Sequence, residues 1–154
     1  MRFSKKSDYA LRVLVMLAEH YGEGPKSIRK LAESNDVPYR FLQQIVLDLR
    51  EKGWIITHAG RDGGITLGKP PEFIRMGEVV RHFDGVLAPM GCVSTTHYEP
   101  CSQEGHCRFR RTLLEIRNHT AKLMDQTSLA MLLADTPPTR DEVFTQYFHD
   151  GAGI

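Results

Sequence analysis

The sequence predicts a mainly α-helical protein with one small β-hairpin. Apolar residues recur at helical spacing through the first fifty positions, β-branched and aromatic runs follow directly after Gly53, and helical spacing returns from residue 76 onward. The chain has 154 residues, close to the usual size of one domain. We therefore expect one domain, or one domain with a small appendage.

The composition is that of an ordinary globular protein. Hydrophobic residues make up 41% of the chain and charged residues 25%, which favours a packed core over a disordered or fibrous chain. No stretch approaches the roughly 18 consecutive apolar residues of a membrane span, and the charged N-terminus lacks a signal-peptide cleavage site. We expect a cytoplasmic protein.

Charge is divided unevenly along the chain. The formal net charge is +1, but residues 1–69 contain 12 Lys and Arg against 8 Asp and Glu, whereas residues 70–154 contain 8 against 11. Such a small excess is weak evidence for nucleic-acid binding, because solvated surfaces usually carry both signs. The order of the predicted elements is more informative.

Two helices are predicted in the first 35 residues. The first spans about residues 7–20, with Ser7 as its N-cap and Asp8 in its first turn, where a negative charge suits the helix dipole. The second begins after Ser27, which can cap it, and ends near Asn35.

A third helix and a hairpin follow. The helix opens with Pro38, whose missing N–H costs nothing in a first turn, and runs to about Lys52. Residues 54–58 and 65–67 have strand composition, and the glycine-rich segment 60–64 lies between them. Three helices followed by a hairpin are the order of a winged helix-turn-helix.

Polar side chains lie at the positions from which a winged helix-turn-helix contacts DNA. They cluster at the start of the third helix, opposite its apolar stripe, and Arg61 lies at the glycine-rich tip of the hairpin. Arg and Gln suit bidentate contacts to guanine and adenine, and an arginine on such a tip can follow a phosphate or enter the minor groove. The residues predicted to contact DNA are Ser27, Pro38, Tyr39, Arg40, Gln43, Gln44, Arg61 and Gly63.

Four segments are expected along the chain. They are a winged helix-turn-helix DNA-binding domain at 1–69, a connecting helix (76–83) and cysteine loop within 70–107, a dimerisation helix and terminal short helix at 108–134, and a tail at 135–154.

The helix that starts near Arg108 carries a short heptad seam. Its members fall at alternating spacings of four and three, and a long helix with such a seam needs a partner. A homodimer is therefore expected, and packing of the seam within one chain is the alternative. The seam residues are Phe109, Leu113, Ile116, Thr120 and Leu123. Thr127 or Ser128 can cap the short helix that follows.

All three cysteines, Cys92, Cys101 and Cys107, lie in the loop before that helix. This odd, clustered set points to metal or redox chemistry rather than to a secreted disulfide framework. Iron-sulfur ligation is one possibility, zinc binding together with His97 and His106 is another, and a lone redox thiol is a third. The sequence contains neither a phosphate loop nor a recognisable catalytic triad or carboxylate pair, so an enzyme is not expected.

Several motifs together resemble one family, the dimeric winged-helix bacterial transcriptional regulators that include IscR, NsrR, RirA and CymR. The resemblance extends from Met1 to about Ala134. The matching segments are 7–12, 37–42, 60–64, 67–70, 76–80 and the three-cysteine loop.

The resemblance implies a homodimeric repressor that binds a pseudo-palindromic DNA site and carries an iron-sulfur cluster responding to redox, nitric oxide or iron status. In cluster-bearing members three loop cysteines hold the cluster, which here implies Cys92, Cys101 and Cys107, with 4Fe-4S favoured over 2Fe-2S. In NsrR-like members an aspartate from the first helix of the other subunit is the fourth ligand, and Asp8 stands at that position. The alternative role of Asp8 is to stabilise its own helix dipole.

This chain departs from the family pattern in two respects. Eight residues separate Cys92 from Cys101, a longer gap than in IscR-like and NsrR-like loops and closer to that of RirA-like loops. Position 110, three residues after Cys107, is an arginine and not the histidine of IscR-like members. A cluster-free, CymR-like regulator controlled by a partner protein or small molecule is therefore the alternative, as is a zinc-binding regulator.

Overall fold

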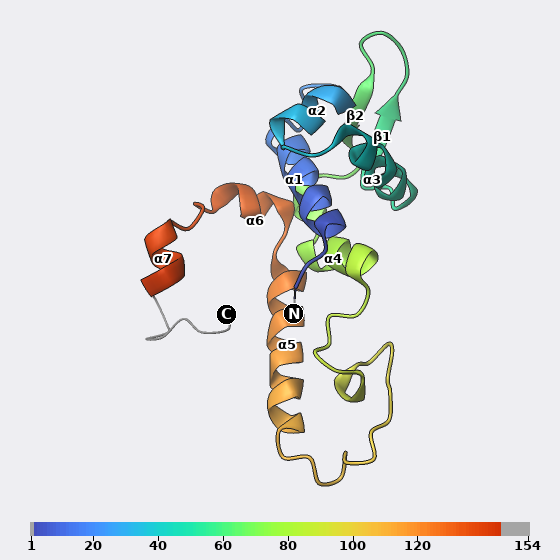
Figure 1. The fold of residues 1–154 in the computed structure, drawn as a ribbon. Helices are drawn as coiled ribbons and strands as arrows, with labels where there is room; N and C mark the ends of the chain where they lie inside the picture. The colour runs from blue at the N-terminus through green and yellow to red at the C-terminus, as the bar shows by residue number, and fades with distance from the viewer. Residues whose placement is uncertain (1, 146–154) are drawn as a thin grey trace.

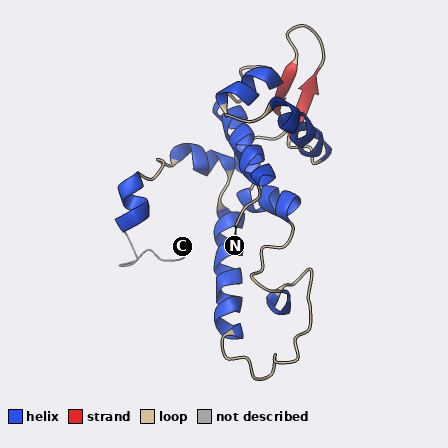
Figure 2. Cartoon of the chain, in the orientation of Figure 1, coloured by secondary structure: helices blue, strands red, loops and turns tan. Residues whose placement is uncertain are grey.

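The computed structural model describes residues 2–145 as a mainly helical chain with one hairpin, as predicted. In Figures 1 and 2 the first three helices and the hairpin form a head, and a long helix leads away from it beside an extended loop. The elements are α1 (Lys5–Glu19), α2 (Ile28–Ser34), α3 (Tyr39–Glu51), β1 (Ile55–His58), β2 (Gly64–Leu67), η1 (Pro71–Phe73), α4 (Met76–Asp84), η2 (Gly91–Val93), α5 (Arg110–Gln126), α6 (Leu129–Ala134) and α7 (Arg140–Thr145). None of the helices in this part of the chain has the length and apolar character needed to cross a membrane.

The first helix begins earlier than predicted, because its N-cap is Ser4 and not Ser7. The Ser4 hydroxyl accepts a hydrogen bond from the backbone N–H of Ser7 at 3.2 Å. Ser7 is fully buried and shares the inward face of α1 with Ala10 and Leu14, at positions i, i+3 and i+7. A residue on the inward face one turn into the helix cannot cap it, so the prediction for Ser7 was wrong.

The core of the head joins α1, α3 and the hairpin with elements from later in the chain. Its fully buried side chains include Leu14, Leu42, Ile45, Leu49, Ile55, Ile65, Ile74, Val79 and Leu129. Ile74 directly follows η1, and Val79 and Leu129 belong to α4 and α6, so these later parts of the chain pack on the head. The boundary at residue 69 stays a prediction, and burial continues across it.

The hairpin forms within one residue of the predicted strands. Ile55 lies opposite Leu67 and His58 opposite Gly64 in an antiparallel pair. Ile65 also exchanges two backbone hydrogen bonds of 2.9 Å with Lys26. The hairpin, which we call the wing, is therefore fixed to the segment that leads into α2.

Three of the five residues of the predicted seam are exposed, and Leu113 and Thr120 are half-buried. Phe109, Ile116 and Leu123 are 63%, 46% and 60% exposed, whereas Met124 is the buried residue of this helix. The three exposed positions favour a partner over the intrachain alternative, and the dimer seam stays a prediction. The helix begins at Arg110, two residues later than predicted.

The last elements are short. Ser128 caps α6 and accepts a hydrogen bond from the N–H of Met131 at 3.2 Å, as one of the two predicted caps. Within the predicted tail, residues 140–145 form α7, and residues 146–154 lie outside the described part of the chain.

Candidate DNA-binding surface and cysteine loop

The N-terminal turns of α3 present the predicted base-reading residues. Arg40, Gln43 and Gln44 are exposed, while Leu42 and Ile45 on the opposite side of the helix are completely buried. The core therefore fixes the helix backbone and leaves the polar face free for a ligand. Pro38 is the N-cap of α3 and is also exposed.

Tyr39 links α3 to α2. The guanidinium of Arg29 lies 5.1 Å from the centre of the Tyr39 ring, a distance suited to a cation–π contact. The Nε2 group of Gln43 lies 3.5 Å from the Tyr39 hydroxyl. The sequence prediction did not include Arg29, although the basic run 26–30, which contains Ser27, was a signal for it.

The remaining predicted DNA residues meet at the wing. Ser27, Arg61 and Gly63 line one hollow of about 660 Å³ between the wing and α2, together with Lys26 and Lys30. The structure thus divides the predicted residues into a group on α3 and a group between the wing and α2. Lys26 and Lys30 were missed by the sequence prediction. With Arg61 they outnumber the acidic lining residue Asp62, and this excess of positive charge suits a phosphate backbone.

The cysteine loop brings two of its three thiols to one pocket. Buried Cys92 and half-buried Cys107 line a pocket of about 460 Å³ against α5, and exposed Cys101 does not line it. Among residues 2–145, no three His, Cys, Asp or Glu side chains lie close enough to hold a metal ion. The thiol donor set suits an iron-sulfur cluster chemically, but this conformation of the loop does not gather all three thiols.

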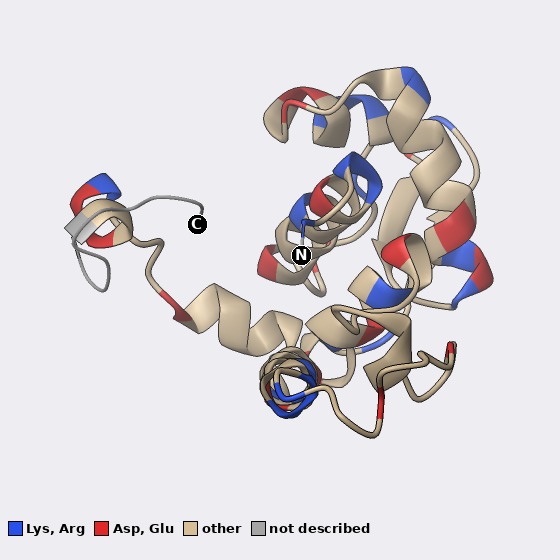
Figure 3. Cartoon of the chain, turned by 60° about the horizontal axis from the view of Figure 1, so that its bottom comes forward, with Lys and Arg blue, Asp and Glu red and all other residues tan. Residues whose placement is uncertain are grey.

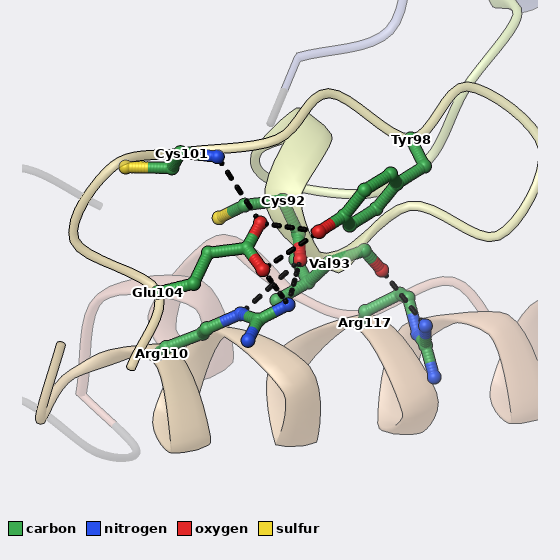
Figure 4. Close-up of polar contacts among 7 residues, drawn as sticks. All are labelled: Cys92, Val93, Tyr98, Cys101, Glu104, Arg110 and Arg117. Carbon is green, nitrogen blue, oxygen red and sulfur yellow. Dashed lines mark hydrogen bonds and ion pairs between the residues drawn. The ribbon is translucent and has the colours of Figure 1, made fainter. Parts of the chain in front are cut away.

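A carboxylate between the second and third cysteines organises the loop (Figure 4). Glu104 accepts a hydrogen bond of 2.6 Å from the Tyr98 hydroxyl and one of 3.1 Å from the backbone N–H of Cys101. It also pairs with Arg110, the first residue of α5, at 3.2 Å. Arg110 in turn donates a hydrogen bond of 2.8 Å to the carbonyl oxygen of Cys92.

These contacts fix the protonation of the two side chains. The hydrogen bonds from Tyr98 and from the Cys101 N–H, with the charge of Arg110, hold the pKa of Glu104 below its ordinary value. The same carboxylate raises the pKa of Tyr98 through the hydrogen bond. At neutral pH the network therefore consists of an ionised acceptor and protonated donors.

A second arginine, seven residues after Arg110 on α5, also anchors the loop. Arg117 donates a hydrogen bond of 2.7 Å to the carbonyl oxygen of Val93. Arg110, Leu114 and Arg117 are spaced i, i+4 and i+7, so they lie on one face of α5 toward the loop. In Figure 3, where α5 is seen end-on, its basic positions are visible around the helix. The i, i+4 and i+7 spacing of Arg110, Leu114 and Arg117 was a sequence signal for this contact between loop and helix, and the sequence prediction did not use it.

Asp8 lies in the first turn of α1, as predicted. Its carboxylate accepts hydrogen bonds of 2.9 and 3.0 Å from Arg12, and the Lys5 ammonium lies 4.0 Å away. The side chain is 34% exposed. A role as ligand toward the other subunit stays a prediction.

Comparison with known proteins gives the family. The Rrf2 family, described as iron-dependent transcriptional regulators, matches residues 3–135. This chain belongs to the Rrf2 family. Members of this family bind DNA as dimers and are transcriptional regulators rather than enzymes, and the same holds for this Rrf2 chain.

Relatives with different names align over most of the chain. A putative rrf2-like regulator of Rhodobacter capsulatus is 36% identical over 88% of this chain and 94% of its own length. NsrR of Geobacillus kaustophilus is 34% identical over 91% of this chain and 95% of its own length. CymR of Bacillus subtilis is 32% identical over 78% of this chain and 86% of its own length.

Solved structures agree with the fold. The structure of CymR, the global cysteine regulator of B. subtilis, superposes with a TM-score of 0.77 at 29% identity, over 89% of this chain and 99% of that one. IscR of T. potens superposes with a TM-score of 0.68 at 22% identity, over 90% of this chain and 94% of that one. Both agree with the winged-helix architecture of this chain.

Proposed function

We propose that this Rrf2 regulator is a cytoplasmic repressor whose cysteine loop holds an iron-sulfur cluster that responds to redox, nitric oxide or iron status. The observation that carries the proposal is the position of the loop. All three cysteines belong to one loop anchored on α5, and Cys92 and Cys107 share a pocket against that helix. A ligand bound there would act on the helix that carries the dimer seam.

The proposed ligands are Cys92, Cys101 and Cys107, with Asp8 of the partner subunit as the fourth. Thiolates are the usual ligands of iron-sulfur clusters, and a carboxylate is a weaker, more exchangeable donor than a thiolate. When bound, the cluster, 4Fe-4S in preference to 2Fe-2S, would supply a group that small oxidants and nitric oxide can attack.

The chain itself offers a route from the loop to the DNA-binding surface. Arg110 and Arg117 hold the loop on α5, and the far end of α5 contacts α4 through a hydrogen-bonded ion pair of Arg81 with Asp125. Helix α4 packs on α1 in the head. A change in the loop can therefore alter the relative placement of the two heads and the half-site spacing that the dimer spans.

The test is anaerobic purification followed by a visible spectrum and assays of iron and sulfide. Replacement of any one of the three cysteines by Ala should abolish the cluster, and Asp8→Ala should leave a cluster that is more labile or has an altered spectrum. Full iron and sulfide with the parental spectrum in Cys101→Ala would show that the ligand scheme is wrong.

A cluster-free regulator is the second candidate, favoured by the similarity to CymR and by the separation of Cys101 from the shared pocket. It predicts a colourless protein that binds its operator without metal and is controlled by a partner protein or small molecule. One bound zinc ion in a colourless protein would instead support a zinc-binding regulator.

A further inference from the structure

We infer that Tyr98, Glu104 and Arg110 form a latch that holds the cysteine loop closed on α5 and must open before the three thiols can share one ligand. The inference rests on the proposed role of the loop as the sensory site. It assigns a regulatory function to three side chains that are not themselves proposed ligands.

The latch is built from convergent, charge-assisted contacts. The Glu104 carboxylate accepts from the hydroxyl of Tyr98 and from the backbone N–H of Cys101, and it pairs with the guanidinium of Arg110. Hydrogen bonds to an ionised group are roughly twice as strong as those between neutral groups. Three such contacts converge on one carboxylate, so loss of the Glu104 side chain removes all of them at once.

The latch connects parts of the loop that are distant in the sequence. Glu104 reaches back to Tyr98 and Cys101, and Arg110 reaches back 18 residues to the carbonyl oxygen of Cys92. One carboxylate and one guanidinium thereby fix the positions of Cys92 and Cys101 relative to the first turn of α5. Opening at Glu104 would free the middle of the loop.

The latched conformation separates the thiols. In Figure 4 the sulfur of Cys101 points away from the Glu104 carboxylate, and its backbone N–H is held by that carboxylate. Cys92 and Cys107 line the pocket on α5 without Cys101. A ligand common to all three thiols requires Cys101 to move toward this pocket, and the hydrogen bond to Glu104 opposes that movement.

Electrostatics also make the latched and ligand-bound loops competing states. Glu104 lies three residues after Cys101 and three before Cys107. A loop segment that closes around a ligand brings its thiolates together, and a carboxylate among them adds like-charge repulsion. The hydrogen bond between the Cys101 N–H and Glu104 would therefore break when Cys101 moves toward the other two thiols.

The test uses the full-length, metal-free protein and the variants Glu104→Ala and Tyr98→Phe. Glu99→Ala is the matched control, because Glu99 lies on the same exposed loop and its carboxylate makes no hydrogen bond or ion pair within the described residues. Hydrogen exchange is followed at the backbone N–H of Cys101, and alkylation is followed separately at each cysteine. Circular dichroism and sedimentation check that the variants remain folded dimers.

In Glu104→Ala, exchange at the Cys101 N–H should accelerate about tenfold or more, because its acceptor is lost and the loop opens more often. Tyr98→Phe should give a smaller acceleration, and Glu99→Ala should match the parent. Equal exchange and alkylation in Glu104→Ala and Glu99→Ala would overturn the latch.

Anaerobic loading with ferrous iron and sulfide forms the second arm. Glu104→Ala should take up iron faster than the parent, because the latch no longer has to open first. A Glu104→Ala variant that exchanges like the parent and no longer binds iron would make Glu104 a ligand and overturn the inference. Faster exchange in a protein that never takes up iron would support the latch and contradict the proposed cluster.

Discussion

At the scale of single residues, Arg40 and Leu42 show how α3 both packs in the core and presents polar side chains for contact with DNA. Leu42 is completely buried and Arg40 is exposed, so the core holds the backbone from which the arginine extends. Replacement of Arg40 or Gln44 by Ala should cost about 1–3 kcal/mol at the cognate site and relax base specificity, if these side chains reach base edges. Gel-shift titrations on matched and mismatched sites measure both effects.

Two controls distinguish base reading from general attraction. Arg61→Ala should weaken binding more evenly across sequences if the wing contacts phosphate. Arg50→Ala removes an exposed arginine from the last turn of the same helix and should leave specificity unchanged. Parental affinity in both the Arg40 and Arg61 variants would contradict this DNA-binding surface.

The two serines at the start of α1 give opposite predictions for stability. Ser4→Ala removes the N-cap hydrogen bond and should lower the free energy of unfolding by about 1 kcal/mol. The buried hydroxyl of Ser7 has no hydrogen-bond partner within the described residues, so Ser7→Ala should be neutral or stabilising. Urea unfolding measures the stability of both variants. A larger loss of stability in Ser7→Ala than in Ser4→Ala would show that Ser7 is the N-cap.

At the scale of elements, the position of the wing depends on one close backbone approach. A Cβ atom added at Gly64 would lie 2.2 Å from the carbonyl oxygen of Lys26. Gly64→Ala should therefore push the wing from the segment before α2 and destabilise the head by about 1–3 kcal/mol. Gly105→Ala is the matched control, because a Cβ there meets nothing within 4 Å. Thermal unfolding with parental stability in Gly64→Ala would contradict this account.

At the scale of the whole molecule, the exposed seam of α5 should be the dimer interface. Ile116→Asp would place a charge in an apolar contact and should convert the dimer to monomer at micromolar concentration, with loss of binding to a two-half-site operator. Lys122→Asp alters charge on the same helix outside the seam and should leave the dimer intact. Sedimentation measures both, and a dimeric Ile116→Asp variant would exclude the seam as the interface.

The local pattern of the sequence determined the elements of this protein. Helices at 28–34 and 76–84 and the hairpin fell within about a residue of the prediction, because periodicity, glycines and strand-forming residues act over a few neighbouring positions. The boundary of α1 was missed because two serines three residues apart can each cap a helix, and only the packing of Ser7 in the core distinguishes them.

The sequence also determined that three cysteines share one loop, but only the tertiary structure decided how that loop is held. Which thiols face α5 depends on Arg110 and Arg117 reaching the backbone around Cys92, across 18 and 24 residues of chain. The role of Glu104 depends on donors that converge from separate parts of the loop and from α5. Such contacts follow from the path of the backbone in space, which the spacing of residues along the chain does not specify.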